Sequence, residues 1–572
     1  MTSDGHWIRP EGAGRGTGTR PAPNRPAGPG QGGPGPDDPA TIALGTLPDA
    51  AAKRAARAAL RRAPLRPAKP PRPAPRTDWL PLLAVLLVQG ALSFRLTGAN
   101  TAFVDEGTYI YSGYQEIAHI AHGSPVATYE TFFSGSPVIY PVVVALADMI
   151  GGLRGTRLLS MFFMLSATTA LHLSTRRLHG SVAAFFAAAS FAALGPTQLL
   201  GGYSTFDSMA LAALAWAGYF TVRLTTGGGY PSMLGAAVFL ALADWTKYAS
   251  LLWTPVIMGI AVFAGHGGSP WQGARWRRGA ELMVVWLVAL VLPAVSADLY
   301  IDGFTHTTLM RAPGTDARSY VAEEAAKWIG PLLVLALIGV VVTLFVTRRE
   351  KNDRSAFWLA LVLLIGGLLA PVNQVRIHTW LSLQKHVDFG AWFACIVVGI
   401  LLARVFLTLK HKVHVVAGVL VTALVIGPLG YVGAGQAAYM FSEWPDSSGL
   451  VAALKPYVHK GKAEYLVENY DVPAYYLRES SNWQQWQDLI GKSYTDPETK
   501  KTLSGAPALQ AAVTDHYYSI VVLDFTQTAD IDTALQPTLK KAGYRVHKIV
   551  ESTRTGDGKY TIYFAPGFGT KK

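Results

Sequence analysis

The sequence has little charge and almost no cysteine. Charged residues make up 15% of its 572 positions, below the roughly 25% that is usual in soluble proteins. The single cysteine, Cys395, lies within an apolar run, so an intrachain disulfide is impossible and any external domain has to fold without one. Residues Met1–Gly30 lack an apolar core, and we therefore expect no cleavable signal peptide.

Long apolar runs are abundant, and half of all residues are hydrophobic. A stretch of about 17–25 apolar residues is long enough to cross a bilayer as a helix. The sequence therefore predicts an α-helical polytopic membrane protein with about eleven transmembrane helices. The expected spans are 79–97, 156–174, 181–199, 208–224, 231–246, 249–264, 280–298, 328–347, 355–371, 387–408 and 414–433.

The formal net charge of +13 raises the question of nucleic-acid binding, which the distribution of charge argues against. Residues 1–78 carry thirteen Lys and Arg against six Asp and Glu, whereas residues 441–572 carry fifteen of each sign. Most of the remaining excess falls in short loops between apolar runs. This is the pattern of membrane topology rather than of a nucleic-acid face.

The run Pro137–Gly151 decides the topology, because it is too short to span comfortably and holds two prolines and Asp148. If it is an interfacial or re-entrant helix, the N-terminal tail and every later Lys/Arg cluster between spans face the cytoplasm, as the positive-inside rule requires. If it spans, those later clusters all lie outside. We therefore predict a cytoplasmic N-terminus, an extracytoplasmic C-terminus and a location in the plasma membrane.

Three regions are expected. Residues 1–77 are rich in Pro, Gly, Ala and Arg and should be a disordered basic tail. Residues 78–440 form the transmembrane domain. Residues 441–572 alternate short apolar segments with helical stretches, which predicts an extracytoplasmic α/β domain. Its expected strands are 463–468, 519–524, 544–550 and 559–564, and no Walker loop, G-x-G-x-x-G motif or zinc pattern occurs in it.

Ionisable groups at or near the outer membrane face are candidates for function, because they are costly there. Asp105 and Glu106 follow the first span, and two neighbouring carboxylates can divide proton acceptance and orientation between them. Asp207 precedes another span. Simpler interpretations are a solvated carboxylate pair for the first two residues and a helix N-cap for Asp207.

Cations gather on the same predicted side. Lys247 either binds a ligand or pairs with Asp244 three residues earlier. Arg376, His378 and Lys385 fit a phosphate at the outer surface, although snorkelling beside interfacial aromatic residues also accounts for them. We predict no metal ligands, because the histidine spacing matches no familiar closed site. A divalent cation remains possible, without a complete ligand set.

The order of short motifs over residues 79–400 resembles the GT-C glycosyltransferases, in the branch of protein O-mannosyltransferases (glycosyltransferase family 39) and aminoarabinose transferases. The motifs that carry the resemblance are Asp105-Glu106, Tyr140-Pro141, Arg157-Leu158-Leu159-Ser160, Arg176-Arg177-Leu178, Asp207 and Thr246-Lys247-Tyr248.

This resemblance implies transfer of a sugar from a polyprenyl-phosphate donor to an acceptor hydroxyl outside the membrane, with inversion and with Asp105 as the general base. Glu106 and Asp207 would orient the acceptor or support the cations, and Lys247, Arg376 and Lys385 would stabilise the leaving phosphate. The acceptor is a protein, polysaccharide or glycolipid, and membrane lipid surrounds the enzyme. The alternatives are a transporter or flippase of a lipid-linked substrate and a non-catalytic scaffold. Polar groups gathered outside, and not at mid-membrane, favour the enzyme.

Overall fold

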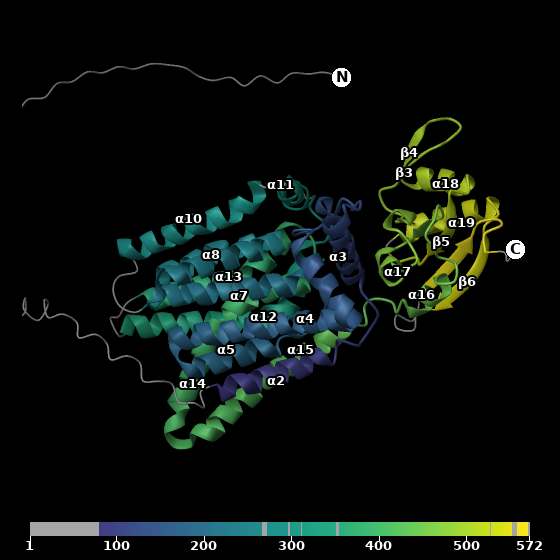
Figure 1. The fold of residues 1–572 in the computed structure, drawn as a ribbon. Coiled ribbons are helices and arrows are strands. Elements are labelled where there is room, and N and C mark those ends of the chain that lie inside the picture. Colours follow the sequence, from purple (N-terminus) through teal and green to yellow (C-terminus); the bar gives the residue numbers. More distant parts are fainter. Residues whose placement is uncertain are drawn as a thin grey trace, which may run out of the picture. The chain divides into compact units, whose positions relative to one another are not determined.

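The structure is a computed structural model that describes residues 79–265, 271–295, 298–310, 312–349, 354–526, 528–551 and 558–569 (Figure 1). The chain divides into two compact units, Met1–Ala74 and Pro75–Lys572, and the descriptions below concern the second unit. The basic tail predicted for residues 1–77 lies outside the described residues.

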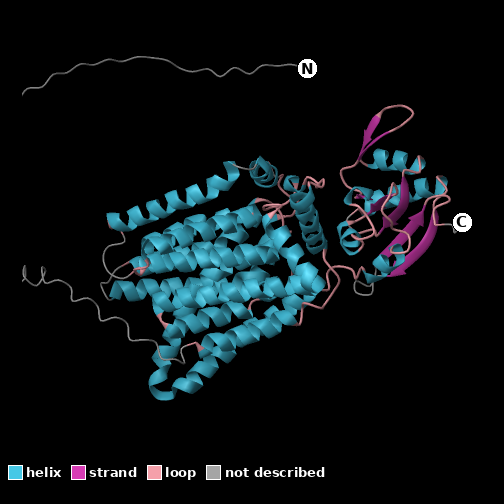
Figure 2. Cartoon of the chain, in the orientation of Figure 1, coloured by secondary structure: helices cyan, strands magenta, loops and turns pink. Residues whose placement is uncertain are grey.

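The first part of the second unit is helical throughout (Figure 2). Short 3-10 segments lie at η1 (Tyr129–Thr131) and η2 (Tyr248–Trp253), and π-helical turns at η3 (Thr305–Leu309) and η4 (Thr422–Ile426). The α-helices are α2 (Leu80–Phe94), α3 (Val104–His122), α4 (Ile139–His179), α5 (Ser181–Ala193), α6 (Gly195–Gly202), α7 (Phe206–Thr225), α8 (Gly229–Thr246), α9 (Thr254–Phe263), α10 (Gly273–Val295), α11 (Asp298–Phe304), α12 (Arg318–Arg349), α13 (Ser355–Arg376), α14 (Leu383–Val421) and α15 (Gly427–Met440).

Several of these helices can cross a membrane, which confirms the predicted class of protein. Among the described residues, five helices are long and apolar enough by themselves, or six if α5 and α6 form one broken span. Two further apolar helical segments, Leu80–Phe94 and Tyr248–Phe263, are shorter. The number eleven and the orientation of the termini therefore stay predictions.

Helix α4 is broken at the point where the sequence predicted a separate short helix. Gly151 and Gly152 leave helical geometry, and Gly152 has a φ of 59° and a ψ of −160°, a backbone conformation that essentially only glycine adopts. The segment that begins at Ile139 is thus a helix of its own, joined through this break to the longer helix that ends at His179. Its position relative to the bilayer is a prediction.

The apolar run expected over 181–199 forms two helices, α5 and α6, which make either one broken span or a re-entrant loop. The chain bends by 67° between α5 and α6, where Leu194 is extended and Pro196 occupies the first turn of α6. Proline is favoured in a first turn but cannot continue a helix from the preceding residues. The bend carries the chain through α6 to Tyr203 and Asp207.

Close packing of the bundle depends on small residues, as in many membrane helix interfaces. Alanines of α5, α7 and α8 are fully or almost fully buried in one hydrophobic cluster with α14. A Cβ atom added to Gly399 of α14 would lie 2.5 Å from the carbonyl oxygen of Ala183 in α5. Glycine at this position therefore lets the two backbones approach each other directly.

The C-terminal part is the predicted α/β domain. Its five-stranded sheet has the order β2-β1-β5-β7-β6, in which β1 pairs in parallel with β2 and β5, and β7 is antiparallel to β5 and β6. The strands are β1 (Glu464–Val467), β2 (Trp486–Gln487), β5 (Tyr518–Leu523), β6 (Arg545–Glu551) and β7 (Lys559–Phe564), with a separate hairpin of β3 (Ser493–Thr495) and β4 (Thr502–Ser504). The helices are α16 (Ser448–Leu454), α17 (Asp471–Tyr476), α18 (Ala506–Thr514) and α19 (Ala529–Lys541), and η5 (Trp483–Gln485) is a 3-10 turn.

The four strands predicted from sequence are confirmed to within one residue at each end, as β1, β5, β6 and β7. Their apolar residues cluster in short runs, so local pattern was sufficient to find them. Strands β2, β3 and β4 were missed because each is only two or three residues long, and α18 was missed as well.

Asp148, the acidic residue in the ambiguous 137–151 run, holds α17 against α3 and α4. Its buried carboxylate accepts hydrogen bonds from the hydroxyls of Tyr114 (2.9 Å) and Tyr475 (2.6 Å), and Arg478 lies 3.1 Å away. The contact is close, since a Cβ atom on Gly107 of α3 would lie 3.0 Å from the carbonyl oxygen of Asp471. The α/β domain therefore contacts the helix that carries Asp105.

Candidate active site

Four charged side chains from four separate helix ends come together. Asp105 lies in the first turn of α3 and Asp207 in the first turn of α7, Lys247 follows the last residue of α8, and Lys385 lies in the first turn of α14. The ammonium of Lys385 donates to the Asp105 carboxylate at 2.6 Å. Lys247 lies 3.1 Å from the Asp207 carboxylate. The structure thus brings together four residues that the sequence had singled out.

The four side chains differ in how far substrate can reach them. Asp207 and Lys247 have side chains that are 1% and 4% exposed, whereas Asp105 is 29% exposed and Lys385 is 11% exposed. The inner pair is a buried ion pair. The outer pair opens to the surface, and Asp105 is the more exposed carboxylate of the group.

Both alternatives weighed for the inner pair are wrong. Thr205, not Asp207, is the N-cap residue of α7. Asp244 accepts a hydrogen bond from the Trp286 indole at 2.9 Å and does not pair with Lys247. The reason is that α8 ends at Thr246 and the backbone of Lys247 is extended (φ −148°), so its side chain leaves the helix face that Asp244 occupies.

A strap formed by Ser134, Gly135 and Ser136 fixes the end of α8. The Tyr248 amide donates to the Ser134 carbonyl at 3.0 Å, and the Ser136 amide donates to the Trp245 carbonyl at 2.8 Å. A Cβ atom on Gly135 would collide with the Thr246 carbonyl. Glycine is therefore required for the close approach that positions Lys247.

Glu106 does not take part in this group, which differs from the expectation of a working carboxylate pair. Its carboxylate receives two hydrogen bonds from Arg157, at 2.8 and 2.6 Å, and both side chains are fully buried. It also accepts the amides of Phe103 (3.0 Å) and Ser204 (2.9 Å). Glu106 thus joins the starts of α3 and α7, which carry Asp105 and Asp207.

Arg157 completes this support from α4. Its guanidinium donates to the carbonyls of Thr97, Asn100 and Thr101 as well as to Glu106. A planar guanidinium with five donors suits such a site better than an ammonium does. In the sequence, Arg157 belongs to one of the ordered motifs but was assigned no role. An arginine at the start of a predicted span indicates a buried partner, and this signal could have identified it.

Arg376 and His378 lie apart from the group. Arg376 is exposed and bonds to the Asn373 side chain at 2.8 Å. The ring of His378 faces Arg318 (3.0 Å) and the carbonyl of Asp316 (3.2 Å). Phosphate binding by either residue stays a prediction with no support from this arrangement.

His386 lies closer to the charged group than Arg376 and His378 do. Its ring nitrogen lies 3.9 Å from the Asp207 carboxylate, and its other nitrogen is 2.7 Å from the Gln374 amide. Tyr203 adds an aromatic face, with the Lys385 ammonium 5.8 Å from its ring centre. The two lysines thus lie among polar and aromatic side chains.

The α/β domain supplies a further carboxylate, Asp471, which sequence reasoning missed. It begins α17 and packs on α3 near Thr108 and Asp105. Burial raises the pKa of Asp471 to about 7, opposed in part by a hydrogen bond from the Thr108 hydroxyl. An acid that titrates near neutrality beside a candidate base is a candidate for positioning an acceptor.

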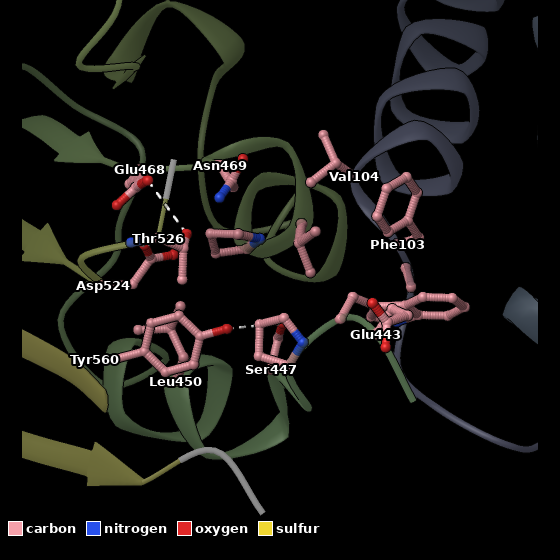
Figure 3. A pocket seen from close by; sticks show the side chains of 15 residues that line it. Phe103, Val104, Glu443, Ser447, Leu450, Glu468, Asn469, Asp524, Thr526 and Tyr560 are labelled. Carbon is pink, nitrogen blue, oxygen red and sulfur yellow. Dashed lines mark hydrogen bonds between the residues drawn. The ribbon is translucent and has the colours of Figure 1, made fainter. Parts of the chain in front are cut away.

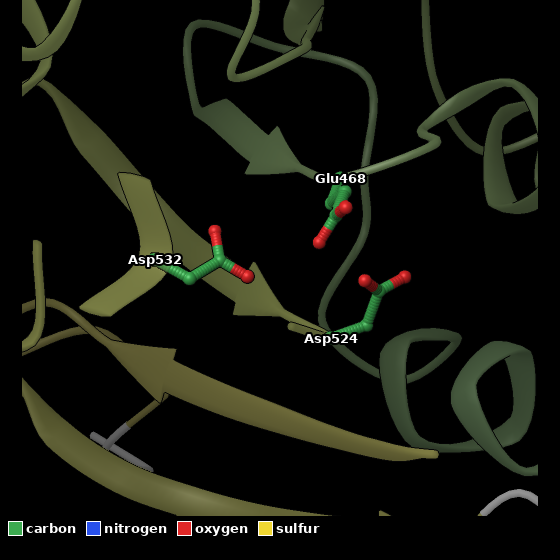
Figure 4. Close-up of side chains that lie close together, drawn as sticks. All are labelled: Glu468, Asp524 and Asp532. Atoms are coloured by element: carbon green, nitrogen blue, oxygen red, sulfur yellow. The ribbon is translucent and has the colours of Figure 1, made fainter. Parts of the chain in front are cut away.

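A second carboxylate group combines Glu468 and Asp524, which directly follow β1 and β5, with Asp532 in the first turn of α19 (Figure 4). Glu468, Asp524 and Asp532 offer oxygens that all lie within 4.8 Å of one another. Burial raises the pKa of Asp524 to about 8, and the proximity of Glu468 adds to this. Three carboxylates could also hold a hard divalent cation, which prefers oxygen ligands. Tertiary contact, not sequence spacing, creates this group.

No protein-family model matches the sequence, and no curated protein shows significant sequence similarity to it. One solved structure similar to the chain is ArnT from Cupriavidus metallidurans bound to undecaprenyl phosphate. It is 17% identical, with a TM-score of 0.55, over 87% of this chain and 100% of that chain. The chain has the GT-C fold. The apo state of ArnT aligns at 15% identity and a TM-score of 0.54, over 85% of this chain and 98% of that one.

A third similar structure is the oligosaccharyltransferase of Archaeoglobus fulgidus tethered to an acceptor peptide. It is 13% identical, with a TM-score of 0.48, over 85% of this chain and 74% of that one. The fold shared with ArnT confirms the GT-C resemblance inferred from the ordered motifs.

Proposed function

We propose that this protein is a membrane glycosyltransferase that transfers a sugar from a polyprenyl-phosphate donor to an acceptor hydroxyl at the outer membrane face, with inversion. The observation that carries the proposal is the partly exposed Asp105 carboxylate, paired with Lys385 beside a buried Asp207–Lys247 pair. The GT-C fold supports it, because an ArnT with this fold was crystallised with undecaprenyl phosphate.

Asp105 is the general base. Its carboxylate takes the proton of the acceptor hydroxyl as the hydroxyl oxygen attacks the anomeric carbon. The bond between that carbon and the phosphate oxygen breaks, and its electron pair stays on the phosphate. The products are the glycosylated acceptor and polyprenyl phosphate, and the configuration at the anomeric carbon is inverted because attack is opposite to the leaving group.

Lys385 and Lys247 stabilise the leaving phosphate. A phosphate gains negative charge as the glycosidic bond breaks, and fixed ammonium groups in a partly dry site are effective at stabilising it. Lys385 is the more exposed of the two and makes its hydrogen bond to Asp105. A bound phosphate competes for this ammonium, which leaves the Asp105 carboxylate available to the acceptor.

The test compares Asp105→Asn with wild type in membranes supplied with undecaprenyl-phosphate-linked hexoses and pentoses carrying a radiolabel. Loss of a general base lowers turnover by about 10²- to 10⁴-fold. Asp302→Asn is the matched control, since Asp302 is an exposed acid in α11 outside the charged group. Undiminished transfer by Asp105→Asn, or no transfer by wild type with any of these donors, would overturn the proposal.

A further inference from the structure

A cavity of about 350 Å³ lies where the α/β domain meets the start of α3 (Figure 3). Its walls come from the loop before α3, from the segment leading into α16, from the loop after β1 and the start of α17, from the loop after β5, and from β7. This volume is at the lower end of the roughly 300–1,000 Å³ of small-molecule sites. The residues that carry its chemistry are Phe103, Glu443, Trp444, Glu468, Asp524 and Tyr560.

The cavity lies beside the candidate base. Val104 lines it and directly precedes Asp105, and Val472 lines it and directly follows Asp471. Asp105 of α3 and Asp471 of α17 are therefore each next in sequence to a residue of the cavity wall. The cavity therefore adjoins the first turn of α3, which carries Asp105.

The lining combines carboxylates with aromatic rings. Glu468 and Asp524 lie at one end, with Asn469 near Glu468, and Phe103 and Glu443 lie at the other end (Figure 3). Tyr560 lies near Asp524, and its hydroxyl points toward Ser447. Among the described residues that line the cavity, none is a lysine or arginine. Carboxylates accept hydrogen bonds from hydroxyls, and aromatic rings supply flat apolar faces. An anionic ligand would meet like charge.

Asn469 adds an amide whose backbone is in an unusual conformation. Its φ is 56°, in the left-handed region, where asparagine is enriched among the residues other than glycine. In the described part of the chain its side chain makes no hydrogen bond to protein. An amide can donate to one hydroxyl and accept from another, and residues in such backbone conformations concentrate at ligand sites.

Resting on the proposed function, we propose that this cavity binds the acceptor, and that the acceptor group it recognises is a neutral, hydroxyl-rich saccharide. Glu468, Asp524 and Asn469 hold its hydroxyls, and the aromatic rings contact its apolar faces. Asp105 then receives the proton of the hydroxyl that extends past Val104. Anionic acceptors, such as phosphorylated or uronic-acid sugars, are excluded by the carboxylates.

The test is saturation-transfer NMR on the full chain in nanodiscs, with neutral methyl glycosides of mannose, glucose, galactose and arabinose. Methyl glucuronide and methyl glucosaminide are the anionic and cationic probes. We expect at least one neutral glycoside to bind, and Asp524→Asn and Asn469→Gly to weaken it by threefold or more. Glycine keeps the positive φ while it removes the amide. Asp530→Asn, an exposed acid in α19, is the control and should bind as wild type does.

Three results would overturn the inference: no binding of any neutral glycoside, unchanged binding in both cavity variants, or preference for methyl glucosaminide or methyl glucuronide. The measurement requires no turnover, so it separates the two proposals. Glycoside binding without sugar transfer refutes the glycosyltransferase proposal alone. Sugar transfer with an acceptor KM that is unchanged in Asp524→Asn and Asn469→Gly refutes the cavity assignment alone.

Discussion

The Lys385 ammonium donates a hydrogen bond to the Asp105 carboxylate at 2.6 Å, although 280 residues separate the two in sequence. This pair joins the start of α3 to the start of α14 at the more exposed edge of the charged group.

Removing the Lys385 ammonium should affect the donor more than the acceptor. A hydrogen bond to a charged group contributes about 1.5–3 kcal/mol, so Lys385→Met should lower kcat/KM for the donor by about 10- to 150-fold. Lys385→Arg should recover part of this loss. Lys327→Met is the control, because Lys327 is an exposed lysine paired with Glu323 and Glu324 in α12. If Lys385→Met lowered kcat/KM for the acceptor as much as for the donor, the result would contradict a role of Lys385 in binding phosphate.

Removing one partner of the buried Asp207–Lys247 pair should destabilise the protein more than removing both partners. Breaking a buried ion pair costs about 3–5 kcal/mol, because the remaining charge is uncompensated. Lys247→Met should therefore lower the free energy of unfolding by about 3–5 kcal/mol. The double variant Asp207→Asn/Lys247→Met should recover most of this stability but remain inactive. Thermal unfolding in nanodiscs measures the first quantity and labelled-sugar transfer the second.

The control for that series is Arg277→Met, which breaks an exposed pair with Glu281 whose side chains are 78% and 39% exposed. Exposed pairs contribute about 0–1 kcal/mol, so this variant should unfold close to wild type. A double variant no more stable than Lys247→Met would show that the pair is not the source of the loss.

Arg157 should not be replaceable by lysine. Arg157→Lys keeps the charge but loses the fork that binds Glu106 and three carbonyls. We expect a loss of stability of about 3 kcal/mol or more and a drop in kcat, since Glu106 positions the turn that holds Asp105. Arg154→Lys, on an exposed position of the same helix, should be neutral. An Arg157→Lys variant that is as stable and as active as the wild-type protein would contradict this role.

Stability of the α/β domain should fall as pH rises. Burial raises the pKa of Asp524 from the ordinary value of 3.8 to about 8, so the folded state binds more protons than the unfolded state between these values. Folding is then favoured at low pH, and the stabilisation is lost as pH rises through the folded pKa. Hydrogen-exchange protection of β1 and β5, corrected for intrinsic rates, should decrease from pH 5 to pH 8.

Asp524→Asn should flatten that dependence, because an amide does not titrate. Exposed Asp530→Asn should leave it unchanged. Protection that increases with pH in wild type would contradict the raised pKa. Added calcium that removes the dependence would instead indicate that the three carboxylates bind a cation.

Local pattern predicted more of the fold than of the site. Apolar runs and short β-rich segments predicted a polytopic helical protein with a C-terminal α/β domain, and four strands agree to within one residue. Bends were not predictable in the same way. The turn at Leu194 follows from one extended residue and Pro196 inside an otherwise continuous apolar run.

Within the site, the sequence identified which residues are charged and outside the apolar runs, but not their partners. Asp105, Asp207, Lys247 and Lys385 could be named in advance because ionisable groups at the membrane face are costly. Glu106 was expected to act beside Asp105, but it binds Arg157, which is 51 residues away in sequence on α4. Asp471 and the Glu468–Asp524–Asp532 group carried no pattern, because their carboxylates meet only in the folded domain.

The sequence by itself therefore determined the class of protein and four strands of the α/β domain, because these depend on apolar periodicity and short-range backbone preference. The GT-C fold was indicated by a resemblance in the order of short motifs. Tertiary structure alone decided that Lys247 turns from Asp244 to Asp207, that Lys385 and not Arg376 joins Asp105, and that a cavity forms beside Asp105. These pairings depend on where helices end and how they pack, and charge–charge contacts act over a few ångströms that sequence distance does not encode.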